Sequence, residues 1–101
     1  MNKPIVINRA PSRHFIHVSP LPVGKTMEQL LSNPIRNFII NKTPIKAHLH
    51  DVLIYPLDFL SEYHCRLALG FTTEQMQQYI KAKFPSIKSK AKIAFYLLEK
   101  I

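Results

Sequence analysis

The chain has 101 residues, of which 47% are hydrophobic and 20% are charged. This length fits one domain, and the composition is that of an ordinary globular protein, which excludes disorder over most of the chain. Fourteen Lys and Arg residues against six Asp and Glu residues give a formal net charge of +8. We therefore expect residues 1–101 to form a single domain with a polyanionic partner, for which nucleic acid is the commonest candidate.

The first 24 residues combine positive charge with short runs typical of strands. Residues 5–8 and 14–19 are rich in β-branched and aromatic side chains, which predicts strands or an extended arm. Residues 1–24 contain no acid. Arg9 and Arg13 are therefore candidates to reach nucleic acid from a basic arm, and a solvated tail or an edge strand is the alternative.

The middle of the chain mixes a clear helix start with two ambiguous runs. Thr26 and Gln29 have the spacing of a capping box, which predicts a helix that ends by Pro34. Residues 35–40 fit a strand and a helix equally well. From Thr43, apolar residues at helical spacing predict a second helix, with a strand as the alternative.

The last part of the chain predicts three further helices. The first is capped by Asp58 and ended by Gly70, with an inward side made of Phe59, Leu60, Tyr63 and Leu67. The next begins with a capping box at Thr72. The last begins at Pro85 and has an apolar stripe formed by Ile87, Ala91, Ala94, Leu98 and Ile101. The expected fold class is mainly α (α+β), with a short β or extended N-terminal part and a mainly helical region over residues 25–101.

Residues 67–88 have the order of elements that a helix-turn-helix requires: a glycine stop, a capped helix, a turn and a helix that starts with lysines. The informative positions are Leu67, Ala68, Gly70, Phe71, Thr72, Gln75, Met76, Ile80 and the triplet Ser86-Ile87-Lys88. In these positions the segment resembles the DNA-binding domain of LuxR-type regulators. The resemblance implies a helix-turn-helix-like C-terminal third, with the motif at residues 72–92 and the triplet on the recognition helix. A helical pair in an ordinary core is the alternative.

This interpretation assigns functional roles to two sets of residues. The expected DNA-binding residues are Ser86, Lys88, Ser89, Lys90 and Lys92, with Arg9 and Arg13 adding contacts. Ile93 and Tyr96 lie away from the apolar stripe of the final helix, so they are expected to be exposed or to bind a partner. A homodimer through this helix would suit DNA with two half-sites.

The function expected from these features is that of a small basic DNA-binding transcriptional regulator, either a dimer or a subunit of a heteromeric regulator. Its partner is double-stranded DNA, together with a second copy or a protein partner. The alternative is a protein-binding adaptor or inhibitor encoded by a mobile element, and RNA binding is a third possibility.

Catalysis, a cofactor and a metal are not expected. The chain has no complete phosphate-binding loop, no serine-hydrolase motif and no paired carboxylates. Cys65 stands next to His64, but adjacent residues of a helix point in different directions. Zinc sites normally use four ligands, several of them cysteines, and this chain has one cysteine and five histidines.

Location is inferred from what the sequence lacks. No apolar run approaches the roughly 20 residues that cross a bilayer, so no membrane partner is expected. The first 13 residues lack the core of a signal peptide. The single cysteine is typical of a reducing compartment. We therefore expect a cytoplasmic protein.

Overall fold

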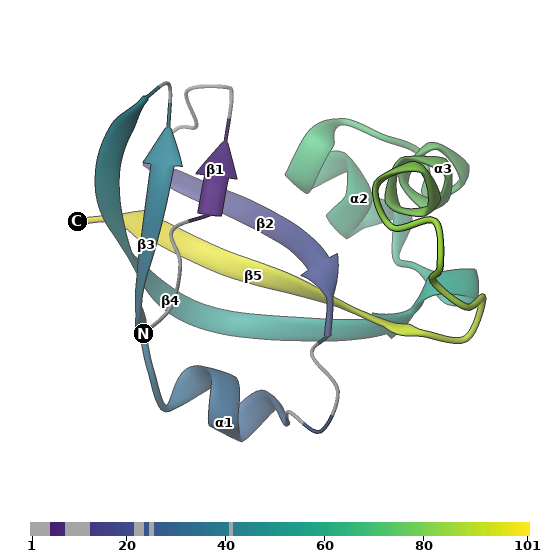
Figure 1. Cartoon of the computed structure of the whole chain (residues 1–101), viewed down its shortest axis with the longest axis horizontal. Helices are drawn as coiled ribbons and strands as arrows, with labels where there is room; N and C mark the ends of the chain where they lie inside the picture. The colour runs from purple at the N-terminus through teal and green to yellow at the C-terminus, as the bar shows by residue number, and fades with distance from the viewer. Residues whose placement is uncertain (1–4, 8–12, 22–23, 25, 41) are drawn as a thin grey trace.

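The structure is a computed structural model, which describes residues 5–7 (backbone only), 13–21, 24, 26–40 and 42–101. Five strands form one curved sheet, with a short helix at one end and a pair of helices on its outer side (Figure 1). The strands are β1 (Ile5–Ile7), β2 (His14–Pro20), β3 (Ile35–Ile40), β4 (Thr43–Pro56) and β5 (Lys92–Lys100). The helices are α1 (Met27–Leu31), the 3-10 helix η1 (Leu57–Phe59), α2 (Glu62–Leu69) and α3 (Thr73–Lys83).

The order of strands in the sheet is β1-β3-β4-β5-β2. Neighbouring strands are antiparallel from β3 to β2, and only β1 pairs in parallel, with β3. The predicted strands near the N-terminus are therefore present, and the ambiguous run at residues 35–40 is also a strand. The predicted fold class, mainly α, is wrong, because a mostly antiparallel sheet forms the centre of the molecule.

The sheet curls strongly enough for its separated strands to meet. The rings of Phe15 on β2 and Phe38 on β3 lie 5.3 Å apart between centroids, in an edge-to-face arrangement. Strands β4 and β5 separate these two strands within the sheet. The contact therefore crosses the concave side, where an inner core forms around Phe15, Phe38, Leu49, Val52 and Leu98, with Leu30 of α1 at its end.

Strand β4 contains a bulge between Leu49 and Asp51. Strict alternation would put Leu49 and Val52 on opposite faces, yet both belong to the inner core. The extra residue of a bulge reverses the alternation and so returns Val52 to the inner face. Ile45, Ala47 and Leu49 alternate as in an ordinary strand, and the bulge makes the next step, to Val52, three residues, so that Ile45, Leu49 and Val52 alone imitate the spacing of a helix. The helix predicted from Thr43 is wrong for this reason, and its alternative, a strand, is what forms.

Strand β5 lies between β4 and β2 and is buried on both faces. Ile93 and Phe95 belong to the outer core under α2 and α3, whereas Ala94 and Tyr96 belong to the inner core. Six consecutive apolar residues, 93–98, are typical of such a central strand. On a helix with one narrow apolar stripe, half of these six apolar side chains would be exposed to solvent. The predicted final helix is therefore wrong, and Ile93 and Tyr96 are core residues rather than exposed contact residues.

The local signals at Thr26, Pro34, Gly70 and Thr72 are confirmed. Thr26 and Thr72 both form capping boxes, with hydrogen bonds in both directions to the glutamine three residues later. Helix α1 ends before Pro34, and Gly70 ends α2 with a positive φ of 72°. Asp58 does not cap α2, because that helix starts only after Ser61.

The side of α2 that faces the sheet also differs from the prediction. Its buried residues are Cys65 and Ala68. Tyr63 and Leu67, which were expected to face inward, are exposed, and so is Phe59 of η1. The predicted face was wrong because the helix was expected to begin at Asp58, whereas η1 and two extended residues precede it.

We expect Gly70→Ala to destabilise the chain by about 1 kcal/mol, because a left-handed backbone is strained in any residue with a Cβ atom. No atom lies within 4 Å of the position a Cβ would take, so crowding adds nothing to this cost. Denaturant unfolding measures the change. Gly70→Asn should lose less, because asparagine tolerates this conformation better. Equal stability of Gly70→Ala and the wild type would contradict the expectation.

Candidate nucleic-acid interface

Residues 84–91, between α3 and β5, form two consecutive turns rather than a helix. The amide of Ile87 donates to the carbonyl of Phe84 at 3.0 Å, and the amide of Ala91 donates to that of Lys88 at 3.0 Å. Pro85 is the second residue of the first turn, a position that suits the fixed φ of proline. It was expected to start a recognition helix. The helix-turn-helix predicted at residues 72–92 is therefore wrong: α3 is its first helix, and the two turns followed by the start of β5 stand in place of the second.

These turns are held against the 3-10 helix η1. The amide of Leu57 donates to the carbonyl of Ala91 at 2.8 Å, and the amide of Asp58 donates to that of Ser89 at 3.1 Å. From α3, the side-chain amide of Gln77 donates to the carbonyl of Leu57 at 2.9 Å. Hydrogen bonds therefore connect α3, η1 and the turns, so the lysines of α3 and those of the turns belong to one connected part of the structure.

We call the lysine surface the five exposed side chains of Lys81, Lys83, Lys88, Lys90 and Lys92, from α3, the turns and the start of β5. Lys81 and Lys83 are two positions apart on α3 and therefore point to different sides of that helix. No Asp or Glu occurs from residue 75 to residue 98, which includes all five. Within the described part of the chain, none of the five lies in an ion pair with a carboxylate. Their charge is therefore available to an anionic ligand.

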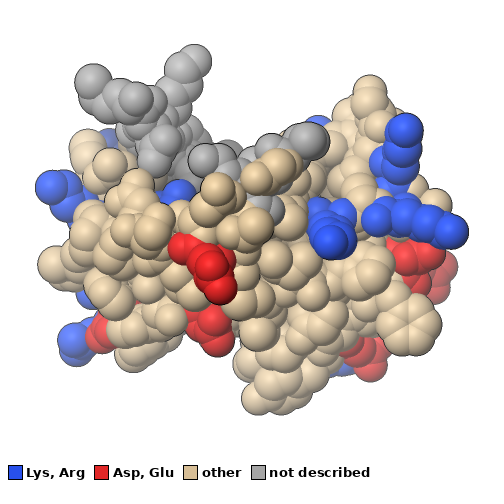
Figure 2. Space-filling model, turned by 90° about the horizontal axis from the view of Figure 1, so that it is seen from below, with Lys and Arg blue, Asp and Glu red and all other residues tan. Residues whose placement is uncertain are grey.

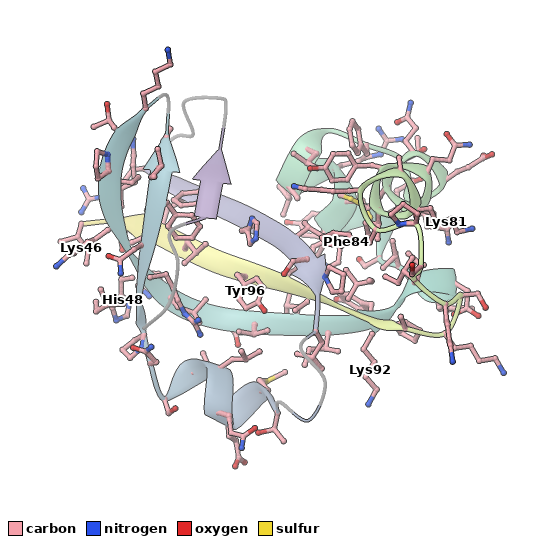
Figure 3. The ribbon with its side chains drawn as sticks, in the orientation of Figure 1. Lys46, His48, Lys81, Phe84, Lys92 and Tyr96 are labelled. Atoms are coloured by element: carbon pink, nitrogen blue, oxygen red, sulfur yellow. The ribbon has the colours of Figure 1, made fainter. Side chains whose placement is uncertain are left out.

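Two views show where this surface lies. Lys81, Phe84 and Lys92 stand on the same half of the molecule, well away from Lys46 and His48 (Figure 3). Seen from below, blue side chains lie on both halves of the molecule, and on the half with the helix pair red side chains lie next to them (Figure 2). Two aromatic rings accompany the lysines: Phe84 is partly exposed, and so is Tyr79, over which the Lys83 ammonium lies 5.7 Å from the centroid.

The structure separates the two groups of predicted DNA-binding residues. Ser86, Lys88, Ser89 and Lys90 lie together in the exposed turns, and Lys92 opens β5. Arg13 instead precedes β2 and pairs with Glu99 at the far end of β5, at 2.9 Å. Lys92 and Glu99 are seven positions apart on the extended strand, which is roughly 23 Å. Arg9 lies outside the described residues.

The prediction missed Lys81 and Lys83. Both lie in the C-terminal turn of α3, outside the segment from which the DNA-binding residues were predicted. The acid-free run from residue 75 to residue 98 was the signal that could have included them.

Glu99 forms a second polar cluster, at the other end of β5. Its two carboxylate oxygens contact Arg13 and His50, and the Nε2 atom of His50 donates to one of them at 2.7 Å. The hydrogen bond with His50 is the main cause that lowers the pKa of Glu99, while burial opposes it and the charges of His14 and Arg13 add to it. Arg13 is therefore partly neutralised here, so it suits a structural role better than phosphate binding.

The remaining reactive side chains have structural surroundings. Cys65 is fully buried, and burial raises the pKa of its thiol, which disfavours the nucleophilic thiolate. The Nδ1 atom of His64 lies 3.1 Å from the hydroxyl of Tyr55 and 3.0 Å from that of Ser61, so this histidine ties α2 to β4. Among the described residues, no group of three His, Cys, Asp or Glu side chains is placed to hold a metal ion.

Comparison with known proteins adds no assignment to this geometry. No protein-family model matches the chain, and neither the curated proteins nor the solved structures yield a match. None of the helices in the described ranges has the length and apolar character needed to cross a membrane.

Proposed function

We propose that this chain binds double-stranded DNA through the phosphate backbone, with the lysine surface as its contact. The observation that carries the proposal is the exposure of five lysines within a run of sequence, residues 75–98, that contains no acid; Asp58 of η1, whose amide donates to the carbonyl of Ser89, is the acid that the fold brings to the turns. DNA presents a phosphate charge about every 1.7 Å along its axis, so several lysines on one surface can each neutralise a phosphate and release a counterion.

The contacts come from turns and a strand start, so they differ from those of a recognition helix. Turn residues such as Ser86 and Ser89 offer hydroxyl and amide donors that suit phosphate oxygens. Reading of bases in the major groove requires an element that enters it, typically a helix or a two-stranded ribbon. The proposal is therefore backbone binding with weak sequence preference, and gene regulation would depend on a partner or on DNA shape.

We expect the double variant Lys88→Ala/Lys90→Ala to bind a labelled 20-base-pair duplex more weakly than the wild type. Its slope of log affinity against log salt should be smaller by about 2, because each lost phosphate contact removes about 0.9. Fluorescence anisotropy over a salt series measures both quantities.

The matched control is Lys42→Ala/Lys46→Ala. It removes the same number of charges from the β3–β4 hairpin, and both lysines are exposed. Its affinity and slope should change much less. Equal losses in the two double variants would show that only net charge matters, and no loss in Lys88→Ala/Lys90→Ala would contradict the proposal. Stronger binding to a single strand of the same length would assign a different nucleic acid to the surface.

A further inference from the structure

Helix α2 has an exposed apolar face on the side opposite the sheet. Tyr63 is 69% exposed and Leu67 is 56% exposed, and four-residue spacing puts them on one side of the helix. Phe59, four residues before Tyr63 in the chain, is 80% exposed. These three residues, here called the α2 surface, present large apolar side chains to water, which is typical of a contact site.

The α2 surface is held in place by the opposite side of the helix. Cys65 and Ala68 are buried in the outer core, and His64 is hydrogen-bonded to Tyr55 of β4. A rotation of α2 that buried Tyr63 and Leu67 would break these contacts. The exposure is therefore a fixed property of the folded chain.

We infer that the α2 surface binds a second copy of this chain, in an antiparallel, two-fold pairing of one α2 with the other. The charges beside the apolar residues favour this occupant. Glu62 and Arg66 are one helical turn apart, only loosely paired at 3.7 Å, and both more than half exposed. In a two-fold interface every contact between two different residues occurs twice, once in each direction. In the antiparallel pairing, Glu62 of each copy therefore lies opposite Arg66 of the other.

The net charge of the chain opposes self-association at long range. The chain carries +8, and residues 47–80, which contain α2, carry −3, so two copies repel unless salt screens these charges. The apolar contact and the reciprocal pairs of Glu62 with Arg66 are therefore what favours the α2 pairing. The inference does not rest on DNA binding, because it concerns association of the chain alone.

Sedimentation equilibrium without DNA tests the inference at concentrations from micromolar to a few hundred micromolar. We expect a monomer–dimer equilibrium in the wild type, and a dissociation constant at least about tenfold higher in Leu67→Asp, because this change puts a charge into the apolar contact. The control is Ile101→Asp, which changes an even more exposed apolar residue outside the α2 surface and should leave the constant unchanged. A wild type that stays monomeric throughout would overturn the inference, and so would dimers that lose association in Ile101→Asp instead.

Charge reversal tests the two-fold geometry independently of the apolar residues. Glu62→Arg alone and Arg66→Glu alone should each weaken the dimer about tenfold, because each puts like charges opposite one another twice. The double variant Glu62→Arg/Arg66→Glu restores both opposite pairs and should return to within about threefold of the wild type. If the double variant dimerised as weakly as the effects of the two single variants combined, the antiparallel pairing would be overturned. Circular dichroism confirms that each variant is folded.

Discussion

Ile93→Asp is expected to unfold the chain. Ile93 has no exposed surface and lies on the central strand β5, under α2 and α3. Removal of the isoleucine side chain from such a site costs about 2 to 5 kcal/mol, and an unpaired buried carboxylate adds several more. The sum reaches the total stability of an ordinary domain, which is about 5 to 15 kcal/mol.

The matched control is the same substitution one residue earlier, Lys92→Asp. Lys92 is exposed at the start of β5, so this variant should remain folded, with a change typical of surface positions, about 0.5 kcal/mol or less. Circular dichroism and urea unfolding of the two variants measure the difference. An Ile93→Asp chain as stable as Lys92→Asp would contradict the central position of β5 and would favour the helix predicted from sequence, in which Ile93 faces outward.

Features set by neighbouring residues were predictable from the sequence. A capping box needs only a threonine and a glutamine three residues later, and both of those at Thr26 and Thr72 form. The helix stop at Gly70 depends on the conformational freedom of one residue. The strands at residues 5–7 and 14–20 follow from their β-branched and aromatic composition.

Features set by distant partners were not predictable in this way. Strand β4 has helical spacing only because a bulge shifts its alternation, and a bulge is defined by the partner strand. The stripe through Ala94 and Leu98 also fits a strand covered on both sides. Strands β2 and β4, which flank β5 in the sheet, are far from it in sequence, so local periodicity could not show them. This error led to the predicted recognition helix and to the prediction that Ile93 and Tyr96 are exposed.

The candidate site was predictable in part, for the same reason. The lysines at residues 88–92 are close together in sequence, and the structure leaves them exposed together. Arg13 was grouped with them on charge alone, but the pairing of β2 with β5 puts it beside Glu99. The contact between Arg13 and Glu99 spans 86 positions of sequence, which no local pattern reveals.

His17 is the titratable group whose burial should affect stability most strongly. Its ring is stacked on Tyr96, with centroids 5.8 Å apart, and meets the edge of Phe38 at 6.0 Å. Burial, and to a smaller extent the positive charge of Lys83, lower the pKa of His17 to about 4 from its ordinary value of 6.5. The imidazole is therefore neutral in the folded chain at neutral pH.

The sign of the pH dependence follows from this shift. The unfolded chain takes up a proton at His17 as the pH falls below 6.5, whereas the folded chain resists it until about pH 4. Stability from this residue is thus present above pH 6.5 and is lost progressively between pH 6.5 and pH 4. A difference of this size between the two pKa values corresponds to roughly 3 kcal/mol of unfolding free energy.

We expect His17→Phe to remove this loss, because phenylalanine can pack against Tyr96 and Phe38 without a proton to bind. Urea unfolding at pH 7, 6, 5 and 4 should show the variant gaining on the wild type as the pH falls, by roughly 3 kcal/mol over the range. Phe38→Leu serves as the control, since it weakens the packing around His17 but leaves the imidazole in place. It should lower stability by a similar amount at each pH. Parallel curves for His17→Phe and the wild type would contradict the half-buried, neutral state of His17.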